Sequence, residues 1–234
     1  PRPRLAAPLE APFMSRLCRE RTGLMQAPGA GAVAIRAPVD ALIDGWLARN
    51  PQESVHLLVT HSHGHGDHTA GDSQFAGRPD TTIVGPSQPA VAAYFGITNW
   101  PTQIVEHDLG GRILDVIPIP GHQTAHIALY DRRTGLLFTG DSLYPGRLYI
   151  SNFSQYHASV QRLVDFTENL PVCHVLGTHI EMSNTPTVDF PLGSTHHPDE
   201  HPLELGREHL LELLDALGAM AASPHIEEHD EFII

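Results

Sequence analysis

The 234-residue chain lacks any run of about 18 apolar residues, so the sequence predicts no membrane-spanning helix. Basic residues are scarce, because 14 Lys and Arg stand against 27 Asp and Glu, for a formal net charge of −13. A surface that binds nucleic acid is therefore not expected. The chain has only two cysteines, far apart in sequence, which argues against a disulfide framework. Cys173 lies in the apolar run 172–176 and is expected to be buried.

No signal peptide is recognisable in the sequence, which favours a cytoplasmic protein. Because the chain begins at Pro1 rather than at Met, a periplasmic or secreted protein stays an alternative. The length fits one large domain or two small ones with a substantial core. The apolar content of 41% is ordinary for a globular protein.

Short apolar runs that predict strands alternate with segments in which apolar residues recur at helical spacing. We expect strands at residues 55–60, 81–85, 103–107, 111–119, 127–131, 136–139, 172–176 and 231–234. We expect helices at residues 39–49, 86–95, 154–169 and 203–222, and a short one near 13–20. The rest of the first 31 residues is expected to be mostly irregular, and 181–202 to form a long loop. This mixed order favours an α/β sandwich with helices outside.

Histidine is the outlier of the composition, with 17 residues, and four of them fall between His61 and His68. The stretch from His63 to His68 reads HGHGDH, which fits the spacing H-x-H-x-D-H directly after a predicted strand. Imidazole and carboxylate groups suit zinc, with iron or manganese less favoured. The alternative is a solvated loop that is merely rich in histidine, and the placement after an apolar strand disfavours it.

A single segment can hardly complete two metal sites, so further ligands are expected from other strand ends. His122, Asp141 and His179 each stand a few residues after a predicted strand. Residues at one set of strand ends share one edge of a layered fold, where sites assemble. Each of the three alone would fit an ordinary turn, but together they predict a second group of ligands.

These motifs resemble those of the metallo-β-lactamase superfamily, with spacings typical of its glyoxalase-II-like branch. The resemblance runs from about Thr22 to His179, and its motifs are THSHGHGDH at 60–68, PGH at 120–122, TGD at 139–141 and GTH at 177–179. It implies an αββα sandwich in a single domain over 1–234, with a dinuclear metal site on one edge. It also implies ligand roles: His63, His65 and His122 for the first metal, Asp67, His68 and His179 for the second, and Asp141 as the bridge.

The expected activity is hydrolysis of a small ester, lactone or thioester by two Zn²⁺ ions that share a water and lower its pKa from about 15.7 toward 7. Asp67 and Asp141 are the expected catalytic residues. Promiscuous hydrolysis of β-lactams or phosphodiesters is an alternative, and so is a metal-binding scaffold with weakened catalysis. Asp141 argues against a dedicated antibiotic hydrolase, because β-lactam-hydrolysing relatives commonly carry Cys or Ser there.

Other polar residues have weaker assignments. Tyr144, Tyr149 and His196 are candidates for contact with a small-molecule substrate, as are His197 and His201. Packing or a solvated surface is the alternative for each of them. His61, His126 and His174 are expected outside the metal site, as a supporting or packing residue, a structural residue and a strand residue, in that order.

The N-terminal part departs from the family pattern. Relatives carry an Asp-Thr-Gly-like turn after several strands, whereas this chain has Arg21-Thr-Gly23 with only 20 residues ahead of it. The first sheet is therefore expected to be short of strands. Because an uncovered sheet edge tends to pair with another chain, we expect a homodimer or a higher oligomer.

Overall fold

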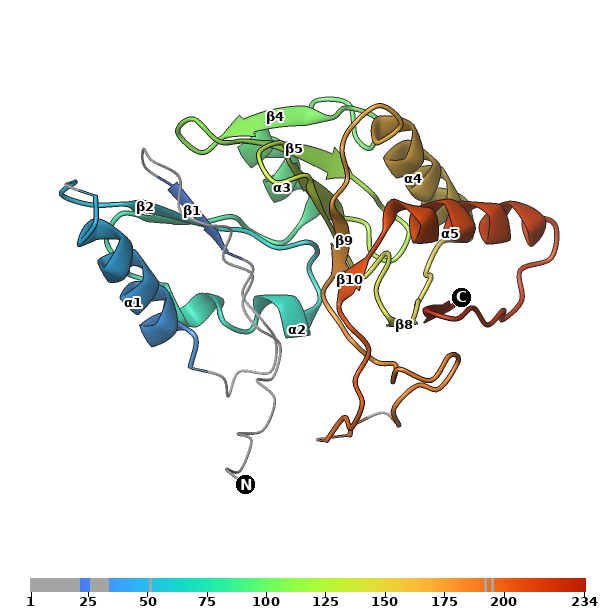
Figure 1. Cartoon of the computed structure of the whole chain (residues 1–234). Coiled ribbons are helices and arrows are strands. Elements are labelled where there is room, and N and C mark those ends of the chain that lie inside the picture. The colour runs from blue at the N-terminus through green and yellow to red at the C-terminus, as the bar shows by residue number, and fades with distance from the viewer. Residues whose placement is uncertain (1–21, 26–33, 51, 192, 195) are drawn as a thin grey trace, which may run out of the picture.

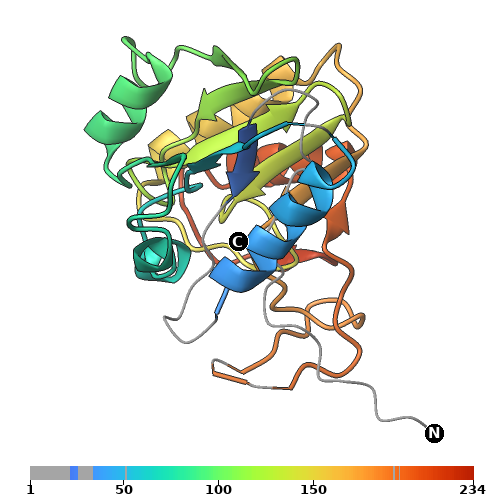
Figure 2. The same cartoon turned by 90° about the vertical axis from the view of Figure 1, so that its left-hand side faces the viewer.

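The computed structural model describes residues 22–25, 34–50, 52–191, 193–194 and 196–234. Two sheets lie face to face between helices, with α1 (Arg36–Leu47) on one side and α4 (Phe153–Phe166) and α5 (Arg207–Ala219) on the other (Figures 1 and 2). This order of layers is the αββα sandwich expected from the sequence. The short helix expected near 13–20 lies outside the described residues. No described helix is long and apolar enough to span a membrane.

The first sheet is parallel, in the order β1 (Thr22–Met25), β2 (His56–Val59) and β3 (Thr81–Ile83). It has three described strands, against six in the second sheet. The first 31 residues were expected to be mostly irregular, and β1 is a strand within them that was not predicted. That strand is defined by its pairing with β2, more than 30 residues later, which a local pattern does not reveal.

The second sheet has the strand order β10-β9-β7-β6-β5-β4. An antiparallel meander runs through β4 (Val105–Asp108), β5 (Ile113–Pro118), β6 (Ile127–Asp131) and β7 (Leu136–Gly140). β9 (His174–Gly177) adds parallel to β7, and β10 (Glu204–Leu205) adds antiparallel to β9. β5, β7 and β9 therefore run in one direction and end at one edge. The remaining elements are α2 (Gly66–Thr69), the 3₁₀ turn η1 (Asp72–Gln74), α3 (Gln88–Phe95) and a parallel pair of β8 (Gly146–Arg147) and β11 (Phe232–Ile233).

Alternation along β2 explains why the layers stack. Leu57 and Val59 belong to the apolar cluster formed with α1, while Leu58 lies in the cluster between the sheets. Because successive strand residues point to opposite faces, β2 contributes to both cores. β5 does the same, with Val116 facing β2 and Ile117 in the cluster of α4 and α5.

The expected helices and strands are confirmed to within a few residues, with two corrections. The last long helix begins at Arg207 rather than at 203, because residues 204–205 pair with β9 as β10. Cys173 is exposed rather than buried. It lies one residue before β9 begins, where the chain passes the β6–β7 turn and the Cys173 amide donates to the Gly135 carbonyl at 2.7 Å.

Candidate metal centre

The histidine-rich segment leaves β2 and reverses through a tight loop into α2. The loop holds His63 and His65, and the first turn of α2 holds Asp67 and His68. A Cβ atom on Gly64 would lie 2.8 Å from the Pro86 carbonyl oxygen, so only glycine fits this approach. Four candidate ligands thus diverge from one short stretch.

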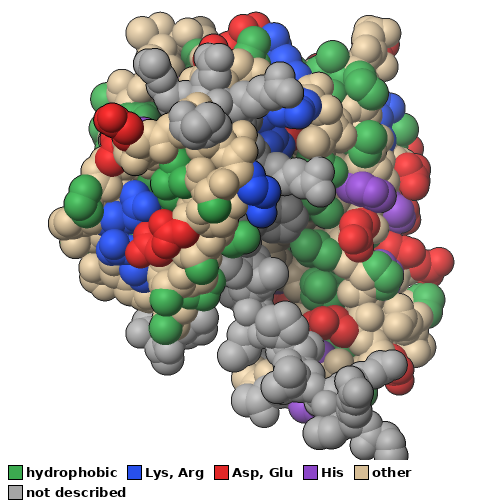
Figure 3. Space-filling view, turned by 60° about the vertical axis from the view of Figure 1, so that its left-hand side comes forward, with side chains coloured by type: hydrophobic (Ala, Val, Ile, Leu, Met, Phe, Trp, Pro, Cys, Tyr) green, Lys and Arg blue, Asp and Glu red, His purple; other side chains and the backbone are tan. Residues whose placement is uncertain are grey.

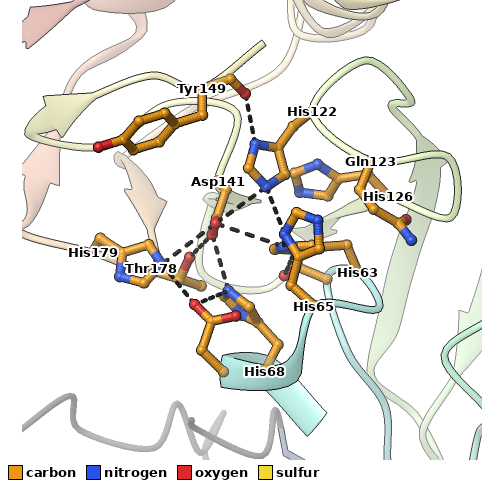
Figure 4. Close-up of polar contacts among 12 residues, drawn as sticks. His63, His65, His68, His122, Gln123, His126, Asp141, Tyr149, Thr178 and His179 are labelled. Carbon is orange, nitrogen blue, oxygen red and sulfur yellow. Dashed lines mark hydrogen bonds and ion pairs between the residues drawn. The ribbon is translucent and has the colours of Figure 1, made fainter. Parts of the chain in front are cut away.

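The other candidates come from the edge where parallel strands of the second sheet end. His122 follows β5, Asp141 follows β7 and His179 follows β9. Figure 4 shows these side chains and those of His63, His65 and His68 converging on one point, and Asp67 lies with His68, Asp141 and His179. All seven candidate ligands predicted from the sequence therefore meet in one place.

The first cluster consists of His63, His65, His122 and Asp141, whose ligand atoms all lie within 4.8 Å of one another. His65 Nδ1 lies 2.9 Å from His63 Nε2 and 3.1 Å from His122 Nε2. His122 Nδ1 is 2.7 Å from the Tyr149 carbonyl oxygen, to which it must donate. In the neutral ring, Nε2 therefore carries no proton, and its lone pair points into the cluster.

The second cluster consists of Asp67, His68, Asp141 and His179, again within 4.8 Å. His68 Nε2 lies 3.4 Å from Asp67 Oδ2 and 3.3 Å from Asp141 Oδ1. His179 Nε2 lies 3.3 Å from Asp141 Oδ2. The Asp67 side chain is about half exposed, at 51%, which leaves this cluster open toward solvent.

Asp141 is the member that both clusters share. Its Oδ2 is 3.6 Å from His63 Nε2 and 3.4 Å from His122 Nε2, in addition to its contacts with the second cluster. The Thr178 hydroxyl donates a short hydrogen bond to Asp141 Oδ1 and so orients the carboxylate (Figure 4). The two clusters and their shared carboxylate fit a binuclear metal site, with the partition of ligands that the resemblance implies.

Burial and charge set the protonation of the centre. Burial lowers the pKa of His63 and His122 below the usual 6.5, so both rings are neutral and can ligate. Burial also disfavours charge on His68, but Asp141 and Asp67 outweigh it and raise the pKa of His68 to about 9. Burial alone would raise the pKa of Asp141, yet hydrogen bonds from His179 and His68 hold it far below 3.8. Asp141 is therefore an anion throughout the physiological range.

Further residues pack against the candidate ligands without belonging to either cluster. His126 is fully buried and its ring lies 4.7 Å from the ring of His63, centroid to centroid. Gly140, with φ +54°, passes so close that a Cβ atom there would collide with His126 and Ser62. Sequence reasoning assigned His126 a structural role, but did not single out Thr178, Gly140 or Ser62. Little in the sequence marks these three residues, because each is distinguished only by preceding a candidate ligand in the chain.

The candidates for substrate contact are placed differently from one another. Tyr144 is buried, and its hydroxyl donates to the Arg147 carbonyl, so it packs behind His179 rather than facing a substrate. Tyr149 is 52% exposed and holds His122 through its backbone. His196 is exposed on the 181–202 loop, where His197 stacks on Phe190 with 4.2 Å between ring centroids. Of these candidates, Tyr149 combines an exposed side chain with a position beside the candidate ligand His122, where it could contact a substrate.

Comparison with known proteins supports the family suggested by the motifs. Residues 46–196, well over half of the chain, match the family model described as the metallo-β-lactamase superfamily. Hydroxyacylglutathione hydrolase of Halorhodospira halophila is 33% identical over 156 residues, which cover 63% of this chain and 56% of the relative. The same-named protein of Chromohalobacter salexigens is 34% identical over 145 residues, covering 60% and 55%. The matched region therefore spans only about half the length of these relatives.

Solved structures show the same fold. A metallo-β-lactamase from Hirschia baltica superposes with a TM-score of 0.56 at 13% identity, covering 89% of this chain and 85% of that one. One from Pontibacter korlensis gives 0.52 at 17% identity, covering 85% and 83%. At such identities the likeness concerns the fold alone. Taken with the family match and the seven converging side chains, it shows that the chain belongs to the metallo-β-lactamase superfamily.

Proposed function

We propose that this chain is a hydrolase that uses two Zn²⁺ ions to cleave a small ester, lactone or thioester. A thioester is the leading substrate class, because the relatives described above are named hydroxyacylglutathione hydrolases. The observation that carries the proposal is the position of Asp141. Its carboxylate lies 3.3–3.6 Å from imidazole nitrogens of both clusters, which is where a bridging ligand belongs.

The donor set fits zinc. Each cluster offers imidazole nitrogens and carboxylate oxygens, which are the ligands of catalytic zinc sites. His65 Nδ1 lies so close to His63 Nε2 and His122 Nε2 that at most one nitrogen of each pair can carry a proton, and a cation satisfies such converging lone pairs. Iron or manganese would accept the same donors less readily.

Each residue has a role toward the ions. His63, His65 and His122 would hold one zinc, Asp67, His68 and His179 the other, and Asp141 both. When bound, zinc lowers the pKa of water from 15.7 to about 7 and polarises a substrate carbonyl. Thr178 orients Asp141, and the exposed Asp67 carboxylate can accept a proton at the open side of the centre. No serine or cysteine nucleophile is required.

Metal analysis and a substrate panel test this function. We expect two zinc ions per chain after reconstitution, and hydrolysis of a hydroxyacylglutathione thioester well above that of a simple ester, a lactone, a β-lactam or a phosphodiester. His122→Ala and His179→Ala should each remove one zinc, because each belongs to only one cluster. Fewer than two zinc ions in the wild-type chain would overturn the proposal, as would hydrolysis that survives both substitutions.

Self-association and location complete the proposal. β1 lies at the end of the strand order in the described part of the first sheet, and edge strands tend to pair with other chains. We therefore propose a homodimer or higher oligomer, and separately propose that the protein acts in the cytoplasm on a small-molecule substrate. A monomer in sedimentation velocity would contradict the first statement, and an exported protein in cell fractionation the second.

A further inference from the structure

His61 is the histidine of the segment that neither cluster uses. It lies two residues after the end of β2, and its side chain is only 2% exposed. Its Nε2 donates to Asp72 Oδ1 at 2.7 Å. This buried histidine, which belongs to neither cluster, therefore has a partner of its own.

The bond joins the two ends of the segment that supplies most of the ligands. His61 stands before the loop, and Asp72 opens η1 just after α2. Between them lie His63, His65, Asp67 and His68, together with Gly64 and Gly66. Glycines widen the range of backbone conformations, so such a loop needs a restraint to hold its ligands in place.

Asp72 can provide that restraint because η1 is itself anchored. The Gln74 side chain accepts hydrogen bonds from the backbone amides of Ile35 and Arg36 at 3.0 and 3.2 Å. Phe75, directly after η1, is 1% exposed and lies in the apolar cluster with α1. These contacts link the start of α1 to η1, and the hydrogen bond between Asp72 and His61 extends this link to the histidine-rich segment.

We propose that His61 and Asp72 are positioning residues, whose hydrogen bond closes the 61–72 segment and holds its four candidate ligands at zinc-binding spacing. This inference rests on the proposed zinc function. Residues that support a ligand without touching the metal typically change metal affinity 10–100-fold when they are replaced, on the order of magnitude seen in other zinc proteins. His61 acts through the loop, and Asp72 acts through His61.

Zinc affinity of the full chain, measured by competition with a chromophoric chelator, tests the proposal. His61→Asn and Asp72→Ala should each weaken zinc binding by about 10–100-fold. His61→Gln should stay close to wild type, because the glutamine amide nitrogen reaches the place of Nε2, whereas the asparagine amide does not. The double variant should bind no more weakly than either single variant, because both remove one bond.

The His56–Asp80 pair is the matched control. It joins the same residue types at 3.0 Å at the other end of β2, away from the candidate ligands. His56→Ala, which removes this bond, should leave zinc affinity unchanged. Near-ultraviolet circular dichroism of the metal-free chains checks folding, and Asp72→Ala, at a side chain 26% exposed, serves if His61→Asn does not fold.

Two results would overturn the inference while the wild-type chain still binds two zinc ions. One is wild-type zinc affinity in both His61→Asn and Asp72→Ala. The other is loss of one zinc in His61→Gln with none lost in Asp72→Ala, which would make His61 a ligand. A wild-type chain that binds fewer than two zinc ions would instead refute the proposed function itself.

Discussion

Two buried aspartates stand at the ends of neighbouring strands and have opposite surroundings. Asp131 ends β6 and is 0% exposed, while Asp141 follows β7 and is 5% exposed. Because β6 and β7 are antiparallel, the two carboxylates lie at opposite edges of one sheet. A buried carboxylate needs a compensating cation or several hydrogen bonds at either edge.

At the first edge the protein supplies its own cation. Arg112, 3% exposed, donates its Nε to Asp131 Oδ1 at 3.1 Å and pairs closely with Oδ2 through Nη2. The Thr134 hydroxyl and the Arg133 amide donate as well. This carboxylate is fully matched within the fold, which is typical of a structural ion pair.

At the other edge Asp141 faces histidines instead of arginine. Four imidazole Nε2 atoms lie within 3.6 Å of it, and burial keeps His63 and His122 neutral. Lone pairs and an anion gathered at one point are typical of a cation-binding site. The comparison of Asp131 with Asp141 indicates that burial alone does not mark an acidic residue as functional. Partners that can bind a metal do.

Asp141→Asn should have the largest effect, because it changes the carboxylate that both clusters share. We expect a loss of both shared metal contacts and a fall in thioester hydrolysis of more than about 1,000-fold, beyond the cost of removing one stabilising donor. Steady-state kinetics and zinc analysis measure this. Zinc content and activity that stay at wild-type levels would remove Asp141 from the site.

Asp131→Asn is the same substitution in the structural ion pair with Arg112, at the opposite edge of the sheet. It leaves Arg112 buried without its carboxylate, and we expect the free energy of unfolding to fall by about 3 kcal/mol. Urea denaturation of the metal-free chain measures this, with the Asp141→Asn chain as control. Zinc stoichiometry should stay at two per folded chain, and a loss of zinc would mean that the two edges are coupled.

Acid should reveal the smallest difference. Burial raises the pKa of Asp131, but hydrogen bonds from Arg112 and Thr134 outweigh it and hold the pKa below its usual 3.8. Below that pH the unfolded chain takes up the proton first, so the stabilisation present above pH 3.8 is lost as the pH falls through the lower folded value. Urea midpoints between neutral pH and pH 2 should therefore decline less in Asp131→Asn than in wild type. Equal declines would contradict this assignment.

Much of the fold was predictable because local periodicity is strong in this chain. Strands such as β6, at 127–131, and helices such as α4 follow apolar patterns that need no distant partner. β1, β8 and β10 were not predicted, because each is short and defined by pairing with a distant segment. Cys173 was placed wrongly for a related reason, since an apolar run does not show where its strand begins.

For the candidate site, the sequence by itself determined the ligand chemistry. The spacing HGHGDH and the residues His122, Asp141 and His179 after apolar strands specify imidazole and carboxylate donors without any contact map. Only the tertiary structure decided which donors meet, because β5, β7 and β9 must run in one direction for their ends to converge. It also turned His61 toward Asp72 and buried Tyr144 behind His179, since side-chain direction depends on neighbours far away in sequence.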